Sequence, residues 1–200
     1  MTAAGRTRRK LRLLLWAIAA GVVLVDQATK QIALAVLEPQ VPVPVIGDLA
    51  GFTLIFNDGA ALGMGSGFTW VFTLIAVIAF CAVAWVGRKL GSRTWAWALG
   101  LLLGGLTGNL IDRLVRPPAV FHGAVVDFID LYFFICNVAD IAITGAACFI
   151  IITQIRGVSL DGTRESERAG SAEESVENPP RPAEIPPQSA DHDRQEKETP

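Results

Sequence analysis

Four long apolar stretches alternate with more polar segments along the first 156 residues of the chain. They run over roughly 13–37, 68–86, 95–111 and 135–155. Since about 20 residues of α-helix cross the hydrocarbon core of a bilayer, each stretch can be a membrane span. The pattern predicts an all-α membrane protein with four transmembrane helices, in which residues 38–67 and 112–134 form two loops on the same side.

The first of these loops holds a second pattern. The segment VPVPVIGDLAGFTLIFN, residues 41–57, alternates apolar residues with Pro and Gly. Proline cannot donate to a hydrogen-bonded ladder, so such a segment favours short strands at the edge of a sheet. We therefore expect a small β-sheet that lies on the membrane surface.

Composition divides the chain near Arg156. Residues 1–156 hold 12 Lys and Arg against 8 Asp and Glu, whereas residues 157–200 hold 5 against 11. The second part has no Phe, Trp or Tyr, so it can bury too little apolar surface to offset the entropy lost on ordering. We expect 1–156 to be a four-helix transmembrane domain and 157–200 to be a disordered, acidic, cytoplasmic tail.

Basic residues identify the cytoplasmic side of the membrane. They precede the first span and fill the loop between the second and third spans: Arg6, Arg8, Arg9, Lys10, Arg12, Arg88, Lys89 and Arg93. By the positive-inside rule these segments are cytoplasmic, and with four spans both termini are too. The basic N-terminus also resembles a cleavable secretory signal, but the three later spans favour a retained anchor.

Polar residues interrupt the spans at their outer ends. Asp26 and Lys30 lie four residues apart on one helical face, where an ion pair lowers the cost of each charge in the membrane. A structural pair and a functional pair fit this spacing equally well. Before the second span, Asn57 offers an amide and Gly59 allows close approach of a backbone, although a loop-to-helix cap explains both residues more simply.

The third span ends in GGLTGNLIDRL, residues 104–114. Asn109, Asp112 and Arg113 project from one face of this helix, and the glycines allow a neighbouring helix to come close. A structural pair of Asp112 with Arg113 is favoured over direct chemistry, because the arginine would hold that carboxylate ionised.

Two further acids have apolar surroundings. Asp127 lies within GAVVDFIDLYFF, and Asp140 lies one turn inside the fourth span on the same side as Asn137. Two carboxyl groups that meet would share one proton and could act as acid and base on a water molecule that attacks a peptide carbonyl. The spacing leaves Asp112, Asp127 and Asp130 open as the partner of Asp140.

Other chemistries have little support. The chain has no GxSxG or HExxH motif, and His122 is a lone loop histidine that we expect to be solvated, while His192 lies in the tail. No cluster of His, Cys and Asp has the spacing of metal ligands, so we expect neither a metal nor a cofactor.

Five motifs occur in a fixed order: DQATK at 26–30, NDGAALG at 57–63, GNLIDR at 108–113, VVDF at 125–128 and NVAD at 137–140. This series resembles the lipoprotein signal peptidases, or signal peptidase II. The resemblance implies a bacterial membrane aspartyl endopeptidase that cleaves signal peptides from diacylglyceryl-modified prolipoproteins, just before the lipidated cysteine. It also implies an extracytoplasmic β-sheet that cradles the substrate.

The resemblance also implies roles for single residues. Asp127 and Asp140 match the catalytic dyad. Substrate-binding or supporting positions match Asn57, Gly59, Asn109, Asp112, Arg113, Asn137, Asp26 and Lys30. Leu62 and Cys136 depart from the family pattern, in which Phe is usual at both positions.

The partners implied by the resemblance are prolipoprotein substrates and membrane lipids, without nucleic acid. We expect a monomer in the bacterial cytoplasmic membrane, with its active site on the extracytoplasmic side. The alternative function is a small proton-coupled transporter, but that would need acids throughout the bilayer depth, and the inner halves of the last three spans have none. A scaffold that presents the acidic tail to a partner leaves the clustered Asn and Asp residues unexplained.

Overall fold

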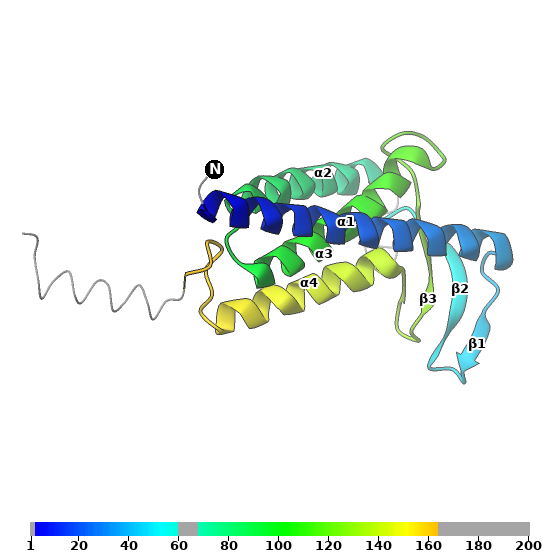
Figure 1. The fold of residues 1–200 in the computed structure, drawn as a ribbon. Helices are drawn as coiled ribbons and strands as arrows, with labels where there is room; N and C mark the ends of the chain where they lie inside the picture. The colour runs from blue at the N-terminus through cyan, green and yellow to red at the C-terminus, as the bar shows by residue number, and fades with distance from the viewer. Residues whose placement is uncertain (1–2, 60–67, 164–200) are drawn as a thin grey trace, which may run out of the picture. The chain divides into compact units, whose positions relative to one another are not determined.

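Four long helices and a small sheet at one end of them make up the computed structural model (Figure 1). It describes residues 3–59 and 68–163, which belong to one compact unit. The elements in chain order are α1 (Ala3–Val36), β1 (Val43–Ile46), β2 (Ala50–Asn57), α2 (Thr69–Val86), the 3-10 helix η2 (Gly87–Lys89), α3 (Arg93–Val115), β3 (Val125–Asp130), β4 (Ile135–Cys136) and α4 (Val138–Ile155). Leu62 and residues 164–200 of the expected tail lie outside the described residues.

All four α-helices are long and apolar enough to cross a membrane. The strands pair in the order β1-β2-β3-β4, and every pairing is antiparallel. The expected fold class, four membrane helices with a small sheet, is therefore confirmed.

Helix α3 packs against the three other helices, and its glycines let α1 and α4 approach closely. A Cβ atom at Gly108 would lie 2.5 Å from Oδ2 of Asp26, and one at Gly105 would lie 2.5 Å from the carbonyl oxygen of Ala139. Neither position has room for a side chain. Small residues thus bring the polar ends of α1, α3 and α4 together.

Helix α1 begins at Ala3, ten residues before the expected span, and two boundaries close to the sheet also differ. Helix α3 continues past residue 111 to Val115, so Asp112 is buried inside the helix and not in a loop. Helix α4 begins only at Val138, because Asn137 caps it and residues 135 and 136 pair with β3 instead. The Asn137 cap sets the start of α4, and Pro117 and Pro118 follow directly after the end of α3; hydropathy alone registers neither signal.

Strand β3 is an element that the sequence analysis missed. It pairs with β2 over most of its length, with Asp127 opposite Ile55 and Val126 opposite Phe56. Asp127, which was expected in a loop, thus lies in a central strand whose first four residues are all buried. The β-branched and aromatic residues around it, VVDFI, are typical of strands and could have indicated this.

Residues 157–163, assigned to the disordered tail by composition, pack onto the start of α3. Nε1 of Trp95 donates to the carbonyl oxygen of Val158 at 2.8 Å, and the Gly91 amide donates to that of Leu160 at 2.9 Å. The Leu160 side chain packs against the core cluster that includes Leu90. The ordered part of the chain therefore extends beyond the expected boundary at residue 156.

We expect Leu160→Ala to lower the free energy of unfolding by about 1 kcal/mol, since Leu160 is half-buried against the core. Leu49→Ala is the matched control, because that leucine is 71% exposed and should change stability by less than about 0.5 kcal/mol. Thermal unfolding in detergent measures both. Equal unfolding midpoints for Leu160→Ala and Leu49→Ala would show that residues 157–163 contribute nothing to the stability of the folded domain.

Candidate active site

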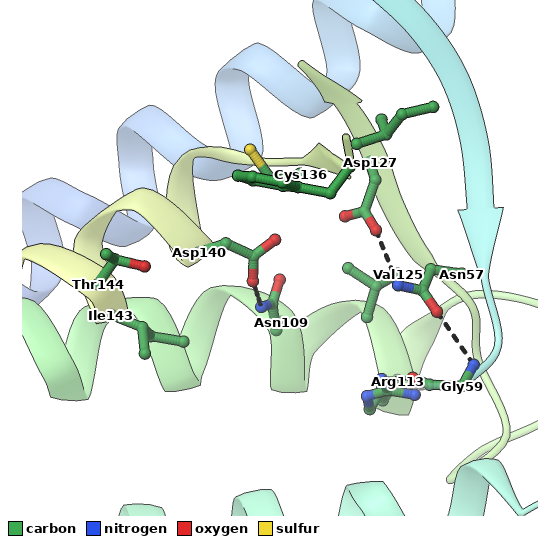
Figure 2. A pocket seen from close by; sticks show the side chains of 12 residues that line it. Asn57, Gly59, Asn109, Arg113, Val125, Asp127, Cys136, Asp140, Ile143 and Thr144 are labelled. Carbon is green, nitrogen blue, oxygen red and sulfur yellow. Dashed lines mark hydrogen bonds between the residues drawn. The ribbon is translucent and has the colours of Figure 1, made fainter. Parts of the chain in front are cut away.

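A pocket of about 470 Å³ opens where β2, β3, α3 and α4 meet (Figure 2). Polar and apolar residues line it together: Asn57, Gly59, Asn109, Arg113, Val125, Asp127, Phe134, Ile135, Cys136, Asp140, Ile143 and Thr144. Asp127 and Asp140 project into the same space in Figure 2. Of the three acids that spacing left open, Asp127 is the one that lines a pocket with Asp140.

Asp127 is 2% exposed, and two amide side chains hold its carboxylate. Nδ2 of Asn137 donates to Oδ1 at 2.6 Å, and Nδ2 of Asn57 donates to Oδ2 at 2.9 Å. Burial, and to a smaller extent the nearby charge of Asp140, raise the pKa of Asp127 to about 6 against the opposing effect of both amides and Lys30. The carboxyl group therefore titrates close to neutral pH.

Asp140 belongs to the first turn of α4, where it completes a capping box with Asn137. The Asn137 amide N–H donates to Oδ2 of Asp140 at 3.2 Å, and the Asp140 amide N–H donates to Oδ1 of Asn137 at 3.0 Å. Oδ1 of Asp140 accepts from Nδ2 of Asn109 at 2.8 Å. Asn137 thus caps the helix and also contacts both acids.

Arg113 forms another wall of the pocket. Nη2 donates to the carbonyl oxygen of Gly59 at 2.7 Å, while the Gly59 amide donates to Oδ1 of Asn57 at 3.1 Å. Within the described part of the chain, Nη1 of Arg113 is buried and has no hydrogen-bond partner. A buried donor without a partner is costly, so this nitrogen is suited to bind an oxygen of a ligand.

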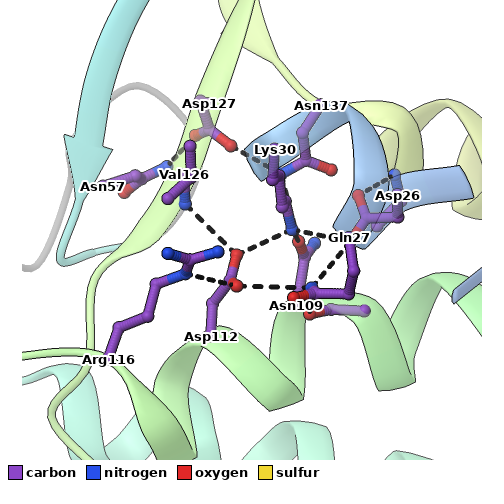
Figure 3. A network of polar contacts seen from close by, with 12 residues as sticks. Asp26, Gln27, Lys30, Asn57, Asn109, Asp112, Arg116, Val126, Asp127 and Asn137 are labelled. Carbon is purple, nitrogen blue, oxygen red and sulfur yellow. Dashed lines mark hydrogen bonds and ion pairs between the residues drawn. The ribbon is translucent and has the colours of Figure 1, made fainter. Parts of the chain in front are cut away.

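Behind the pocket lies a buried ionic cluster of Asp26, Lys30 and Asp112, all fully buried (Figure 3). Nζ of Lys30 lies 2.9 Å from Oδ2 of Asp26 and 2.7 Å from Oδ2 of Asp112. The expected pair of Asp112 with Arg113 is wrong, because Asp112 binds Lys30 and Arg116, while Arg113 turns toward Gly59. The pair of Asp26 with Lys30 forms as expected from its spacing.

Sequence reasoning missed two members of this region. Arg116 donates from Nε to Oδ1 of Asp112 at 2.7 Å, and its spacing of four residues on a helix could have indicated the pair. Gln27 donates from Nε2 to the carbonyl oxygen of Gly108 at 3.1 Å, a contact that no local pattern predicts. His122, as expected, is exposed.

The fold and the site define a multi-pass membrane protein whose pocket holds two aspartates at one end of its helices. Residues 18–156 match the sequence model of the family described as signal peptidase (SPase) II. The chain belongs to this family and is a peptidase, which confirms the resemblance carried by the five motifs and sets aside the transporter alternative.

Individual relatives agree with this assignment. A lipoprotein signal peptidase of Mycobacterium avium is 43% identical over 165 residues, covering 82% of this chain and 90% of the relative. A lipoprotein signal peptidase of Streptomyces coelicolor is 48% identical over 160 residues, covering 79% and 78%. A bacterial membrane enzyme solved at 2.3 Å resolution superposes with a TM-score of 0.62 at 34% identity, covering 72% of this chain and 88% of that enzyme.

We expect Asn137→Ala to be less stable than Asn137→Ser by about 1 kcal/mol, because serine can still cap α4 whereas alanine cannot. Both variants lose the amide donor to Asp127. Asn109 is the matched control, since it lies inside α3, where serine has no such advantage over alanine. Unfolding midpoints in detergent test this, and equal midpoints for the two Asn137 variants would contradict the capping role.

Proposed function

We propose that this chain cleaves signal peptides from diacylglyceryl-modified prolipoproteins, just before the lipidated cysteine, with Asp127 and Asp140 as an acid–base pair that acts on water. The observation that carries the proposal is the shared pocket, in which both carboxyl groups are held by amide donors. Membership of the signal peptidase II family supplies the substrate class.

The pair works with one proton. Asp127 is the proton donor, because its pKa is raised to about 6, mainly by burial, and Asp140 takes the role of the base. Asp140 takes a proton from the water molecule while the water oxygen bonds to the peptide carbon. In the same step Asp127 protonates the carbonyl oxygen. When the C–N bond breaks, Asp140 passes its proton to the leaving amine and Asp127 recovers a proton from the intermediate's hydroxyl group. No covalent intermediate with the enzyme forms.

Substrate binding falls to the rest of the pocket wall. The unpartnered Nη1 of Arg113 suits a main-chain carbonyl oxygen of the substrate, and Asn57 lies beside it on β2. Phe134, Ile135 and Ile143 add apolar surface to the same lining. An extended peptide with a lipid-modified residue would find both hydrogen-bond donors and apolar surface in this pocket.

The location of the pocket supports the proposed orientation. The two acids lie at the sheet end of the helices, whereas the basic residues of α1 and η2 lie toward the opposite end (Figure 1). With the basic end cytoplasmic, both termini are cytoplasmic and the acids meet the scissile bond at the outer surface of the bacterial cytoplasmic membrane.

We expect Asp127→Asn and Asp140→Asn each to reduce cleavage of a diacylglyceryl-modified prolipoprotein by at least about 100-fold, because each removes a proton-transfer group. Asp130→Asn is the matched control: it lies on the same strand, but its carboxylate binds the Thr53 hydroxyl at 2.7 Å. The assay uses purified protein in detergent, with thermal unfolding to verify folding. Turnover by a folded Asp127 or Asp140 variant at the parent's rate would exclude that residue from the catalytic pair.

We expect kcat/KM to fall as pH rises through about 6, because Asp127 then loses the proton that the carbonyl oxygen must receive. Loss of the Asn137 amide donor should raise the pKa of Asp127, so Asn137→Ser should shift the fall to higher pH. Initial rates at low substrate concentration across this range measure both. A parent kcat/KM that increases through pH 6 would instead assign the base role to Asp127.

A further inference from the structure

Two backbone amides tie the aspartate pair to the buried ionic cluster. The amide N–H of Ala139, the residue before Asp140, donates to Oδ1 of Asp26 at 2.9 Å. The amide N–H of Val126, the residue before Asp127, donates to Oδ2 of Asp112 at 3.3 Å (Figure 3). Each carboxylate of the cluster thus holds the backbone directly beside one member of the pair.

Lys30 joins these two anchors. Its ammonium group has three N–H donors, and three oxygens surround Nζ: Oδ2 of Asp26 at 2.9 Å, Oδ2 of Asp112 at 2.7 Å and Oδ1 of Asn109 at 3.1 Å. The side chain is fully buried, so no water competes for these donors. A single cation therefore fixes the distance between the two anchoring carboxylates.

The third contact of Lys30 reaches the pair through a side chain. Because Oδ1 of Asn109 accepts from Lys30, its Nδ2 faces Asp140 and donates to Oδ1 at 2.8 Å. Asn137 donates to the same Oδ1 of Asn109 at 3.0 Å. The orientation of this amide, on which the hydrogen bond to Asp140 depends, thus follows from the position of the ammonium group.

We propose that Lys30 is a positioning residue for the peptidase reaction, which sets the separation and orientation of the Asp127 and Asp140 carboxyl groups through Asp26, Asp112 and Asn109. The inference rests on the proposed function of the aspartate pair. A lysine that only stabilised helix packing would affect unfolding and leave the turnover of the folded protein unchanged.

The chemistry of the lysine suggests which variants separate these two roles. Lys30→Arg keeps the charge, but the planar guanidinium group is larger and cannot direct its N–H groups to three oxygens around one point. Lys30→Met alone would remove the positive charge that pairs with the buried carboxylates of Asp26 and Asp112, so this variant is expected to fold poorly. The double variant Asp26→Asn/Lys30→Met removes one charge of each sign, and the new amide oxygen can still accept from Ala139.

The matched control is Arg116→Gln. Arg116 binds the same carboxylate, Asp112, but its side chain is partly exposed and it pairs with the oxygen that does not bind Lys30. We expect this variant to lower the unfolding midpoint and to keep kcat within about twofold of the parent value, since Lys30 still joins the two anchors.

The experiment compares kcat, KM, pH dependence and unfolding midpoint for the parent, Lys30→Arg, the double variant and the control, with one diacylglyceryl-modified prolipoprotein in detergent. We expect both Lys30 variants to lose about 10- to 100-fold in kcat with little change in KM, since small displacements of reacting groups cost this much. In the double variant, the fall of kcat/KM with pH should also move to higher pH.

That last shift follows from the charges around Asp127. They belong to Lys30 on α1, Arg113 on α3 and Asp140 on α4, with the thiol of Cys136 on β4 as a further titratable neighbour; Asp112 on α3 and Asp58 after β2 act on Arg113. Lys30 lowers the pKa of Asp127, so its removal raises that pKa. Lys30→Arg keeps the cation and should show a smaller shift.

A parent-like kcat and pH profile in the double variant would overturn the positioning role and leave Lys30 as a structural ion. If the double variant does not fold, a parent-like kcat of folded Lys30→Arg would overturn the positioning role in the same way. Asp127→Asn and Asp140→Asn in the same assay keep the two proposals apart: turnover by either at the parent's rate would refute the proposed catalytic pair, whereas a parent-like Lys30 variant refutes only the positioning role.

Discussion

Burial of charge is the constraint on which the arrangement of this molecule depends. Asp26, Lys30 and Asp112 have no exposed surface, and a charge in such surroundings is tolerated only when every oxygen and N–H is paired. Apolar helix faces select a packing partner only weakly in lipid, because the lipid tails are equally apolar. The ionic cluster, with glycines in α3 that let α1 and α4 come close, therefore specifies which helices meet and at which height.

The same constraint separates the pocket from the cluster behind it. The carboxyl groups of Asp127 and Asp140 receive their side-chain hydrogen bonds from the amides of Asn57, Asn109 and Asn137, which carry no charge. An arginine or lysine bonded directly to both acids would favour two ionised carboxylates. Amides orient the carboxyl groups and still allow one of them to keep a proton near neutral pH. The proposed acid–base chemistry requires such a proton.

The sequence predicted those features that follow from local composition or from a motif. Hydropathy located the four spans, spacing identified the pair of Asp26 with Lys30, and the motifs selected six of the residues that line the pocket. Contacts between distant segments were missed, as for Gln27 with Gly108. Residues 157–163 were assigned to the tail because composition describes the average of a long segment, whereas the contacts there are specific: Leu160 is half-buried, and two hydrogen bonds join the segment to Gly91 and to Trp95 of α3.

Strand β3 explains how the two acids come to share a pocket although they belong to different kinds of element. Asp127 is fixed by pairing with β2, and Asp140 is fixed by the first turn of α4. Strand β4 ends directly before Asn137, so the chain passes from the sheet into the membrane helix without an intervening loop. One acid lies on each side of this junction. Neither acid can move far from the other, because the sheet and the helix would have to move apart to separate the two carboxyl groups. A pocket built at such a junction suits the proposed reaction, in which the scissile bond lies between the membrane and the aqueous phase and the peptide extends along the sheet while its lipid stays in the bilayer.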